Sequence, residues 1–207
     1  TAAEILDQAL HFRRSGPVDH AVFMGMGEPM MNLDAVLEAC RALPDIGISH
    51  RHTAISTVGW VPGIRRLMDE PEPIRLALSL HAADETLRSQ IMPVNDRYPL
   101  DEVLAACRDH YEQKRRMVFV EYVMLAGVND SYAQAHQLAE VLDPRMFKVN
   151  LIPYNPTDSP YEGSSPKAIE AFRAELERHG VGATVRLTRG RDIAAACGQL
   201  AAQTPVS

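Results

Sequence analysis

The sequence predicts an α/β protein built on a parallel sheet. Strand-like apolar runs alternate with amphipathic helical patterns along most of the 207 residues, and a small polar cluster follows nearly every strand-like run. Regular alternation of this kind is typical of parallel strands joined by right-handed crossovers. No repeat of fixed period and no low-complexity linker divides the chain, so residues 1–207 are expected to form a single domain.

The elements follow from local patterns taken in order along the chain. The first helix opens at the capping-box sequence Thr1-Ala2-Ala3-Glu4. Later helices are expected where apolar residues recur three and four positions apart, and strands where short apolar runs are bounded by turn residues. The expected helices are 1–14, 33–43, 61–69, 100–114, 131–142 and 166–179. The expected strands are 20–26, 52–56, 74–80, 117–124, 147–153 and 183–188, with a long polar connection between residues 80 and 100.

Composition and charge narrow the class of protein. Apolar residues make up 46% and charged residues 23%, as in ordinary globular proteins. No apolar run approaches the roughly 20 residues that span a bilayer, so no membrane partner is expected. A net charge of −6 argues against general polyanion binding, which leaves local patches such as 114–116 or the arginines of 186–191 for any nucleic-acid contact. Three cysteines without evident pairing, and no secretory signal, favour a cytoplasmic location.

The three cysteines fall into two kinds. Cys40 and Cys107 lie on apolar helical stripes, where a thiol behaves as a small buried hydrophobe. Cys197 stands off any apolar stripe, beyond three arginines and before Gly198. Cationic neighbours favour the thiolate, which is the reactive form. The sequence leaves two interpretations of Cys197 open: a reactive thiol, or a small residue that closes an alanine-rich turn.

Polar clusters at the ends of the strands indicate where a site would form. In parallel α/β folds the loops that follow the strands meet at one edge and build the active site there. Glycines in 25–27 allow a ligand close to the backbone, and Glu28 suits an ammonium group. Ser56, Ser79 and Asn155 can bind hydroxyls or a carboxylate. The set predicts a ligand with an amine, a carboxylate and a sugar, although a plain turn at 27–29 and a structural role for His81 remain alternatives.

Six segments in order resemble the RlmN family of radical S-adenosylmethionine enzymes, which methylate carbon 2 of adenosine in 23S rRNA and tRNA. They are 22–29, 56–59, 78–82, 121–125, 149–156 and the tail around Cys197. The resemblance implies an incomplete (β/α) barrel of the radical SAM type and makes Cys197 the methyl-carrying catalytic residue, which forms a disulfide with a second cysteine on product release. It implies S-adenosylmethionine contacts from Gly27, Glu28, Ser56, Ser79, Leu80, His81 and Asn155.

The chain departs from the family in its cysteines. The family holds a four-iron four-sulfur cluster with a Cys-x-x-x-Cys-x-x-Cys loop, and cysteines at 40, 107 and 197 do not have that spacing. We therefore expect a carboxyl-terminal piece that lacks the first strand, the cluster ligands and the second disulfide cysteine, and that is inactive alone. No metal ligand is assigned to this chain. The cluster and an electron-donor protein are expected of the intact enzyme.

Three other functions remain open. A carbon-8 adenosine methyltransferase of the same superfamily shares these segments. A metal-dependent barrel lyase or isomerase could use Glu28, His81 and Glu121, because carboxylates and histidines at strand ends suit acid–base or metal chemistry. An RNA-binding scaffold could contact phosphates through the basic patches at 114–116 and 186–191, with an affinity that falls steeply with salt.

Overall fold

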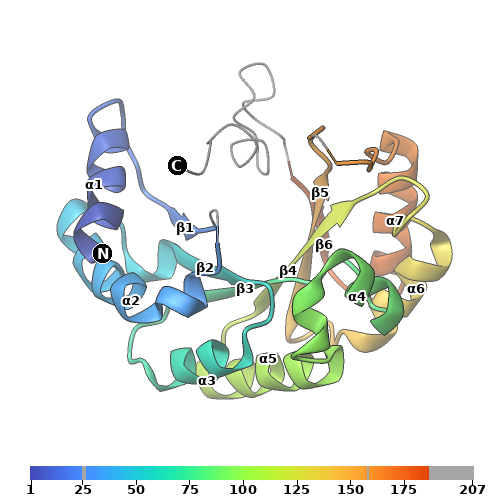
Figure 1. The fold of residues 1–207 in the computed structure, drawn as a ribbon, viewed down its shortest axis with the longest axis horizontal. Helices are drawn as coiled ribbons and strands as arrows, with labels where there is room; N and C mark the ends of the chain where they lie inside the picture. Colours follow the sequence, from blue (N-terminus) through green and yellow to red (C-terminus); the bar gives the residue numbers. More distant parts are fainter. Residues whose placement is uncertain (25–26, 158, 187–207) are drawn as a thin grey trace. The chain divides into compact units, whose positions relative to one another are not determined.

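The computed structural model describes residues 1–24, 27–157 and 159–186. Helices and strands alternate along these residues, coloured in chain order in Figure 1. The strands are β1 (Ala21–Phe23), β2 (Thr53–Thr57), β3 (Arg75–Ser79), β4 (Val118–Met124), β5 (Phe147–Pro153) and β6 (Ala183–Val185). The helices are α1 (Ala2–Arg13), α2 (Leu33–Ala42), α3 (Val61–Asp69), α4 (Glu85–Ile91), α5 (Leu100–Lys114), α6 (Tyr132–Val141) and α7 (Pro166–Arg178).

The six strands form one sheet in chain order, β1 to β6. The pairs β1–β2, β2–β3 and β5–β6 are parallel, with Ala21 opposite Thr53 and Val149 opposite Ala183. The parallel α/β architecture is therefore confirmed. Contacts along the chain group its residues into two compact units, one of residues 1–79 and 94–119 and the other of residues 80–93 and 120 onward. The expectation of a single domain stays a prediction.

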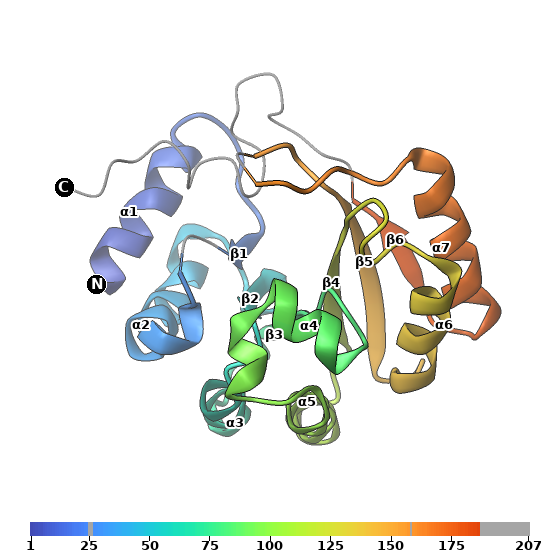
Figure 2. The same ribbon diagram turned by 45° about the vertical axis from the view of Figure 1, so that its right-hand side comes forward.

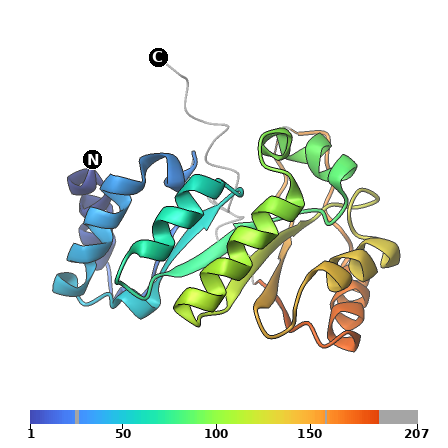
Figure 3. The ribbon, with the colours of Figure 1, turned by 90° about the horizontal axis from the view of Figure 1, so that it is seen from below.

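The first unit contains β1, β2 and β3 with the helices that connect them. Helix α1 begins at the expected capping box, in which the Thr1 hydroxyl accepts from the Glu4 backbone N–H. Helices α3 and α5 pack side by side (Figure 3). Each helix contributes fully buried residues, with Ile64 on α3 and Val103 on α5 both at 0% exposure. This apolar layer supports the strands whose carboxyl ends carry the polar clusters.

The second unit contains most of β4 together with β5, β6 and the helices α4, α6 and α7. Helices α6 and α7 pack against each other (Figure 2). Tyr122 on β4 and Phe172 on α7 lie with ring centroids 5.1 Å apart, and both are buried. The Tyr122 hydroxyl donates to the carbonyl of Asn129 at 2.8 Å, which satisfies the one polar atom of this buried ring.

Most predicted elements agree with the structure to within one or two residues, and one helix was missed. The expected polar connection between residues 80 and 100 contains α4, which the Asp84 side chain caps by accepting from Leu87 N–H. Four 3₁₀ turns were also missed: Pro29–Asn32, Leu43–Ile46, His50–His52 and Pro93–Asp96. The described strand β1 ends at Phe23, before the undescribed residues 25–26.

The basic patch at 114–116 has a structural use that the sequence did not indicate. The Lys114 ammonium donates to the carbonyl of Glu70, and Arg116 Nη1 donates to the carbonyl of Pro73 at 2.6 Å. Arg115 forms an ion pair with Glu112 at 2.7 Å. All three cations are therefore engaged within the first unit, which weakens the case for an RNA-binding patch here. None of the helices in the described part of the chain is long and apolar enough to cross a membrane.

Cys40 and Cys107 are free and fully buried, as predicted. Burial raises the pKa of the Cys40 thiol to about 12, so this sulfur is inert at neutral pH. No disulfide joins cysteines in the described ranges. The disulfide expected of Cys197 falls on residues 187–207, outside the described residues, as does the arginine-rich segment beyond Arg186.

Candidate functional site

A small hollow forms where β1, β2 and β3 end. Its volume is about 80 Å³, and four of the predicted cofactor contacts line it: Gly27, Glu28, Ser56 and Ser79. The remaining wall comes from Met24, Pro29, Thr57 and Val58. Three loops that are far apart in sequence thus deliver a carboxylate and two hydroxyls to one place, because parallel strands end at the same edge of a sheet.

Glu28 is held in this hollow by two backbone amides. Its Oε1 accepts from the Met30 backbone N–H at 2.9 Å, and its Oε2 accepts from the Val58 N–H at 2.8 Å. The first bond caps the 3₁₀ turn Pro29–Asn32, and the second ties this turn to the loop after β2. A carboxylate has about four lone-pair sites, so two backbone donors leave Glu28 able to accept from a ligand. It is a fixed anionic acceptor suited to an ammonium group.

Two neighbouring details shape the hollow. Gly27 has a φ of 109°, a conformation that side-chain-bearing residues rarely adopt, and no atom lies within 4 Å of where its Cβ would be. Glycine is therefore required there by the backbone conformation. In the loop after β2, the Thr57 Oγ1 accepts from the N–H groups of Gly59 and Trp60, both at 3.1 Å. That turn holds Val58 where its amide meets Glu28.

The other predicted contacts, Leu80, His81 and Asn155, belong to the second unit. Leu80 is fully buried and donates its N–H to the carbonyl of Glu121 at 3.0 Å. Asn155 follows β5 and is 5% exposed. The seven predicted contacts therefore divide into four that belong to the first unit and three that belong to the second.

His81 occupies a strained and well-defined position. Its φ of 60° is left-handed, an uncommon conformation for a residue other than glycine. Its Nδ1 lies 3.1 Å from the Val123 N–H and must accept that proton, so the ring is neutral with its own proton on Nε2. Burial, with the nearby Arg88 guanidinium, lowers the pKa of His81 to about 4. At neutral pH His81 is a hydrogen-bond donor through Nε2 and carries no charge.

Asn129 is a buried residue whose importance the sequence pattern did not single out. Its Oδ1 accepts from the Leu125 N–H at 2.8 Å, and its Nδ2 donates to the carbonyls of His81 at 2.9 Å and Val123 at 2.7 Å. Asn129 is fully buried. Its hydrogen bond to His81 joins the loop after β4 to the loop after β3. The sequence signal was the polar run Gly127-Val128-Asn129-Asp130, which follows the strand at 117–124, but the partner at His81 is 48 residues away.

Glu121 has a partner that accounts for its burial. Its Oε2 accepts from the Asn150 amide at 2.9 Å, and burial raises the pKa of this carboxyl group above its usual value. Glu28 belongs to the first unit, whereas His81 and Glu121 belong to the second. Glu28 is bound to two backbone amides, His81 to the Val123 amide and Glu121 to Asn150. Nothing in the described residues therefore favours the lyase or isomerase alternative.

The residues of the hollow fit part of an S-adenosylmethionine molecule. The volume of the hollow, about 80 Å³, is well below the roughly 300–1,000 Å³ of a pocket that encloses a whole ligand of that size. A carboxylate beside two hydroxyls matches the amino-acid end of the cofactor better than its adenine. An iron–sulfur cluster does not fit the described residues, because their two cysteines are fully buried in α2 and α5.

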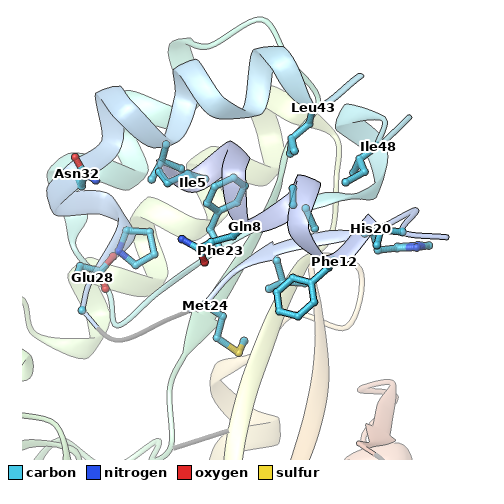
Figure 4. A pocket seen from close by; sticks show the side chains of 17 residues that line it. Ile5, Gln8, Phe12, His20, Phe23, Met24, Glu28, Asn32, Leu43 and Ile48 are labelled. Carbon is cyan, nitrogen blue, oxygen red and sulfur yellow. The ribbon is translucent and has the colours of Figure 1, made fainter. Parts of the chain in front are cut away.

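A larger and mainly apolar cavity of about 530 Å³ lies beside the hollow, in the same unit (Figure 4). It runs between α1, β1 and α2, and it shares Gly27 and Glu28 with the hollow. Most of its wall is hydrophobic, including Ile5, Phe12 and Phe23. Its polar lining side chains are Gln8, His20, Glu28 and Asn32.

The comparisons with known proteins agree with this geometry. Residues 1–139 match the model of the radical SAM superfamily. A "Probable dual-specificity RNA methyltransferase RlmN" of Frankia alni is 46% identical over 98% of this chain and 52% of its own length. The protein of the same name from Parafrankia is 49% identical over 92% of this chain and 51% of its own length. The chain thus spans about half the length of these curated relatives.

Solved structures give the same result for the fold. The crystal structure of a radical SAM methyltransferase from Sphaerobacter thermophilus is 43% identical, covers 96% of this chain and 60% of its own, and superposes with a TM-score of 0.89. A domain of a pyruvate-formate lyase-activating enzyme from Bacteroides vulgatus, 20% identical, covers 82% of this chain and all of its own, with a TM-score of 0.64, and shares the fold alone. The partial barrel of the radical SAM type is thereby confirmed. This chain belongs to the radical SAM superfamily and, within it, to the RlmN family.

Proposed function

We propose that this protein takes part in the methylation of carbon 2 of adenosine in 23S rRNA and tRNA, with S-adenosylmethionine as the methyl donor. The observation that carries the proposal is the similarity of almost the whole chain, at 46–49% identity, to proteins named dual-specificity RNA methyltransferases. The radical SAM superfamily implies S-adenosylmethionine and a four-iron four-sulfur cluster. We place the reaction in the cytoplasm, with an electron-donor protein as a further partner.

The described residues supply binding and orientation. In this proposal Glu28 accepts hydrogen bonds from the ammonium group of the cofactor, and Ser56 and Ser79 bind its polar groups at the ends of β2 and β3. Gly27 lets the cofactor approach the backbone closely. From the second unit, the neutral His81 donates through Nε2, and Leu80 and Asn155 complete the contacts. The cluster supplies the radical chemistry when it is bound, and the described residues of this chain do not hold it.

Cys197 is the proposed methyl carrier, and it lies outside the described residues. A thiolate can take the methyl group of one S-adenosylmethionine by displacement at carbon: the S–CH₃ bond of the cofactor breaks, S-adenosylhomocysteine leaves, and the new bond forms on the cysteine sulfur. The arginines that precede Cys197 in sequence favour its thiolate form. Nothing in the described structure favours carbon 8 over carbon 2 of the target adenosine.

Cofactor binding can be measured before any turnover. Ser79→Ala removes a hydroxyl of the hollow from a half-buried position and should leave the fold intact, while Glu28→Gln removes the negative charge. We expect S-adenosylmethionine affinity, measured by isothermal titration calorimetry on the purified protein, to fall at least about tenfold for Glu28→Gln, since a charge-assisted hydrogen bond is worth about 1.5–3 kcal/mol. Glu38→Gln, at an exposed position of α2, is the matched control.

The methyl carrier needs a separate measurement. Mass spectrometry of the protein isolated from cells should find one added methyl group on the peptide that contains Cys197, and Cys197→Ala should abolish methylation of the RNA. Equal cofactor affinity in Glu28→Gln and Glu38→Gln would contradict the binding site proposed here. An unmodified Cys197 in active protein would contradict the proposed route of the methyl group.

A further inference from the structure

Three potential metal ligands converge where helices α6 and α7 pack against each other, and none of them is among the residues assigned to the cofactor. They are His136 on α6, Glu175 on α7 and His179, the residue that caps the carboxyl end of α7, all in the second unit. Glu175 and His179 are four residues apart, which places both side chains on one face of the helix. The two helices pack against each other, and this brings the ring of His136 to the same place. The ring centroids of His136 and His179 are 4.8 Å apart.

The three ligand atoms form a nearly regular triangle. His136 Nδ1 lies 3.3 Å from Glu175 Oε1 and 3.2 Å from His179 Nε2, and His179 Nε2 lies 3.0 Å from Glu175 Oε1. Zinc binds nitrogen and carboxylate oxygen at about 2.0–2.2 Å, so two ligands of a tetrahedral ion stand about 3.3 Å apart. The triangle therefore matches one face of a tetrahedral coordination sphere without movement of the helices.

Hydrogen bonding alone explains this arrangement poorly. Two ring nitrogens that face each other at 3.2 Å can share only one proton, and the carboxylate oxygen competes for the same protons. A cation at the centre would satisfy the lone pairs of all three atoms at once. Glu140 adds support, because its Oε1 lies 3.5 Å from His136 Nε2, the ring nitrogen that a metal would leave protonated. Metal-bound histidines are commonly oriented by such a carboxylate.

We propose that His136 Nδ1, Glu175 Oε1 and His179 Nε2 form a binding site for a divalent transition-metal ion of the zinc class, which bridges helices α6 and α7. Two imidazoles and a carboxylate are the ligands that such ions prefer. The carboxylate is 5% exposed and the two rings are 41% and 31% exposed, so the ion would reach the site from solvent and keep an open position for water. The bridge would stabilise the helical layer of the second unit.

The guanidinium group of Arg178 binds the carboxylate oxygen that the metal ion would need. Arg178 donates from Nη2 to the same Oε1 of Glu175 at 2.6 Å, and it also donates to the hydroxyl of Tyr132. Its side chain is 61% exposed and can turn into solvent. Metal binding should displace it. Removal of this competitor should therefore strengthen metal binding, an effect that a purely hydrogen-bonded cluster would not show.

The test uses Zn²⁺ alone as the probe, on the purified protein. Isothermal titration with a competing chelator should find one equivalent of Zn²⁺ bound through this site. The affinity for Zn²⁺ should be at least about tenfold lower in His136→Gln and in His179→Gln, because loss of a residue that only supports a metal ligand already lowers metal affinity by about 10–100-fold. Arg178→Gln should bind more tightly than the unaltered protein. His11→Gln, which removes an exposed histidine of α1, is the matched control and should change nothing.

Co²⁺ distinguishes this site from cysteine ligands elsewhere. Bound here, it should give the visible bands of a tetrahedral ion without the near-ultraviolet band of a thiolate ligand, and both histidine variants should lose those bands. Thermal unfolding midpoints measured without metal show whether each variant folds. Zn²⁺ affinity and stoichiometry that are the same in the unaltered protein and in both histidine variants would overturn the proposal, as would a Co²⁺ spectrum of thiolate type alone.

Discussion

At the scale of single residues, Asn129 shows how one side chain can fix a loop that carries a site residue. Its amide satisfies one buried N–H and two buried carbonyls, among them the carbonyl of His81. His81 has a left-handed backbone that other contacts must hold in place. We infer that Asn129 is a positioning residue for His81. It does not itself belong to the predicted cofactor contacts.

Substitution of Asn129 should be costly. In Asn129→Ala the Leu125 N–H loses its partner inside the protein, which costs about 1–3 kcal/mol, and two donated bonds are lost as well. Asn129→Asp keeps the shape but turns an oxygen toward two carbonyls, so it should destabilise at least as much. Urea unfolding measures both. Asn32→Ala, at an exposed asparagine without a side-chain capping bond, should change the unfolding free energy by less than about 0.5 kcal/mol. Equal effects at the two positions would refute the role of Asn129.

His110 on α5 makes a prediction about pH. It is fully buried, and neither ring nitrogen has a hydrogen-bond partner among the described residues. Burial, with the charges of Lys114 and Arg116, lowers its pKa from 6.5 to about 4. Between these values the unfolded chain binds the proton and the folded chain does not. The contribution of neutral, buried His110 to the free energy of unfolding is therefore fully present above about pH 6.5 and is lost as the pH falls toward 4.

The comparison with His110→Leu isolates this contribution. Each unit of pKa is worth about 1.4 kcal/mol, so the unaltered protein should lose up to roughly 3 kcal/mol relative to the variant between pH 7 and pH 4. At pH 7 the variant should be at least as stable, because a buried imidazole without partners gains nothing from its polar atoms. His81 titrates over the same range in both proteins, and its effect cancels in the difference. A constant difference across this pH range would contradict the prediction.

At the scale of elements, the sequence determined most of the fold because its apolar spacing is regular. The helix at 61–69 and the strand at 147–153 were predicted with the bounds that the structure gives. Helix α4 was not predicted because its seven residues carry only two apolar side chains, Leu87 and Ile91, and its start depends on one capping contact from Asp84. The pattern of polar residues after the strands predicted Gly27, Glu28, Ser56 and Ser79 around one hollow.

The remaining features of the site depend on contacts between distant residues, which spacing does not reveal. The bond from Val58 to Glu28 spans 30 residues, and the bond from Asn129 to His81 spans 48. Neither bond leaves a periodic signal. The triangle of His136, Glu175 and His179 is similar, because only the packing of α6 on α7 brings the first residue to the other two. Sequence predicts which residues reach an edge or a face, and packing determines which atoms meet.

The contact between α3 and the turn Pro29–Asn32 gives a prediction at the scale of elements. A Cβ at Gly63 would lie 2.5 Å from the Cβ of Met30 and 2.9 Å from its Cγ, so helix and turn would have to separate. The Met30 N–H binds Glu28, and the displacement would reach the carboxylate of the hollow. Gly63 is needed for this close approach.

Gly63→Ala should therefore destabilise the protein although alanine favours helices. Overpacking costs about 1–3 kcal/mol, and the gain in helix propensity is at most about 1 kcal/mol. Cofactor affinity should fall with stability, because Glu28 shifts. Gly16→Ala introduces the same methyl group where no atom lies within 4 Å, and it should leave both quantities unchanged. Denaturant unfolding and calorimetric titration of S-adenosylmethionine measure the two effects. A more stable Gly63→Ala with normal affinity would show that the turn adapts freely.

At the scale of the whole molecule, the sheet ends in a strand with one open side. β1 is the outermost strand in the sheet order and pairs with β2 alone among the described residues. Val22 on this strand is 56% exposed, and Phe12 on the neighbouring helix α1 is 62% exposed. Both line the apolar cavity of about 530 Å³, in which Phe12 is labelled in Figure 4. An unpaired strand edge beside apolar surface favours pairing with another chain.

We expect the 207-residue chain alone to associate with copies of itself through β1. Val22→Lys should reduce this association, because a lysine on an edge strand must give up its hydration when two edges pair. Met31→Lys removes an apolar side chain that is even more exposed, at 68%, on the turn Pro29–Asn32, and should leave the association unchanged if the strand edge is responsible. Light scattering after size-exclusion chromatography measures the mass of all three proteins. A monodisperse monomer that melts in one cooperative transition would show that the first unit covers this edge by its own packing, and the open side of β1 would then carry no tendency to associate.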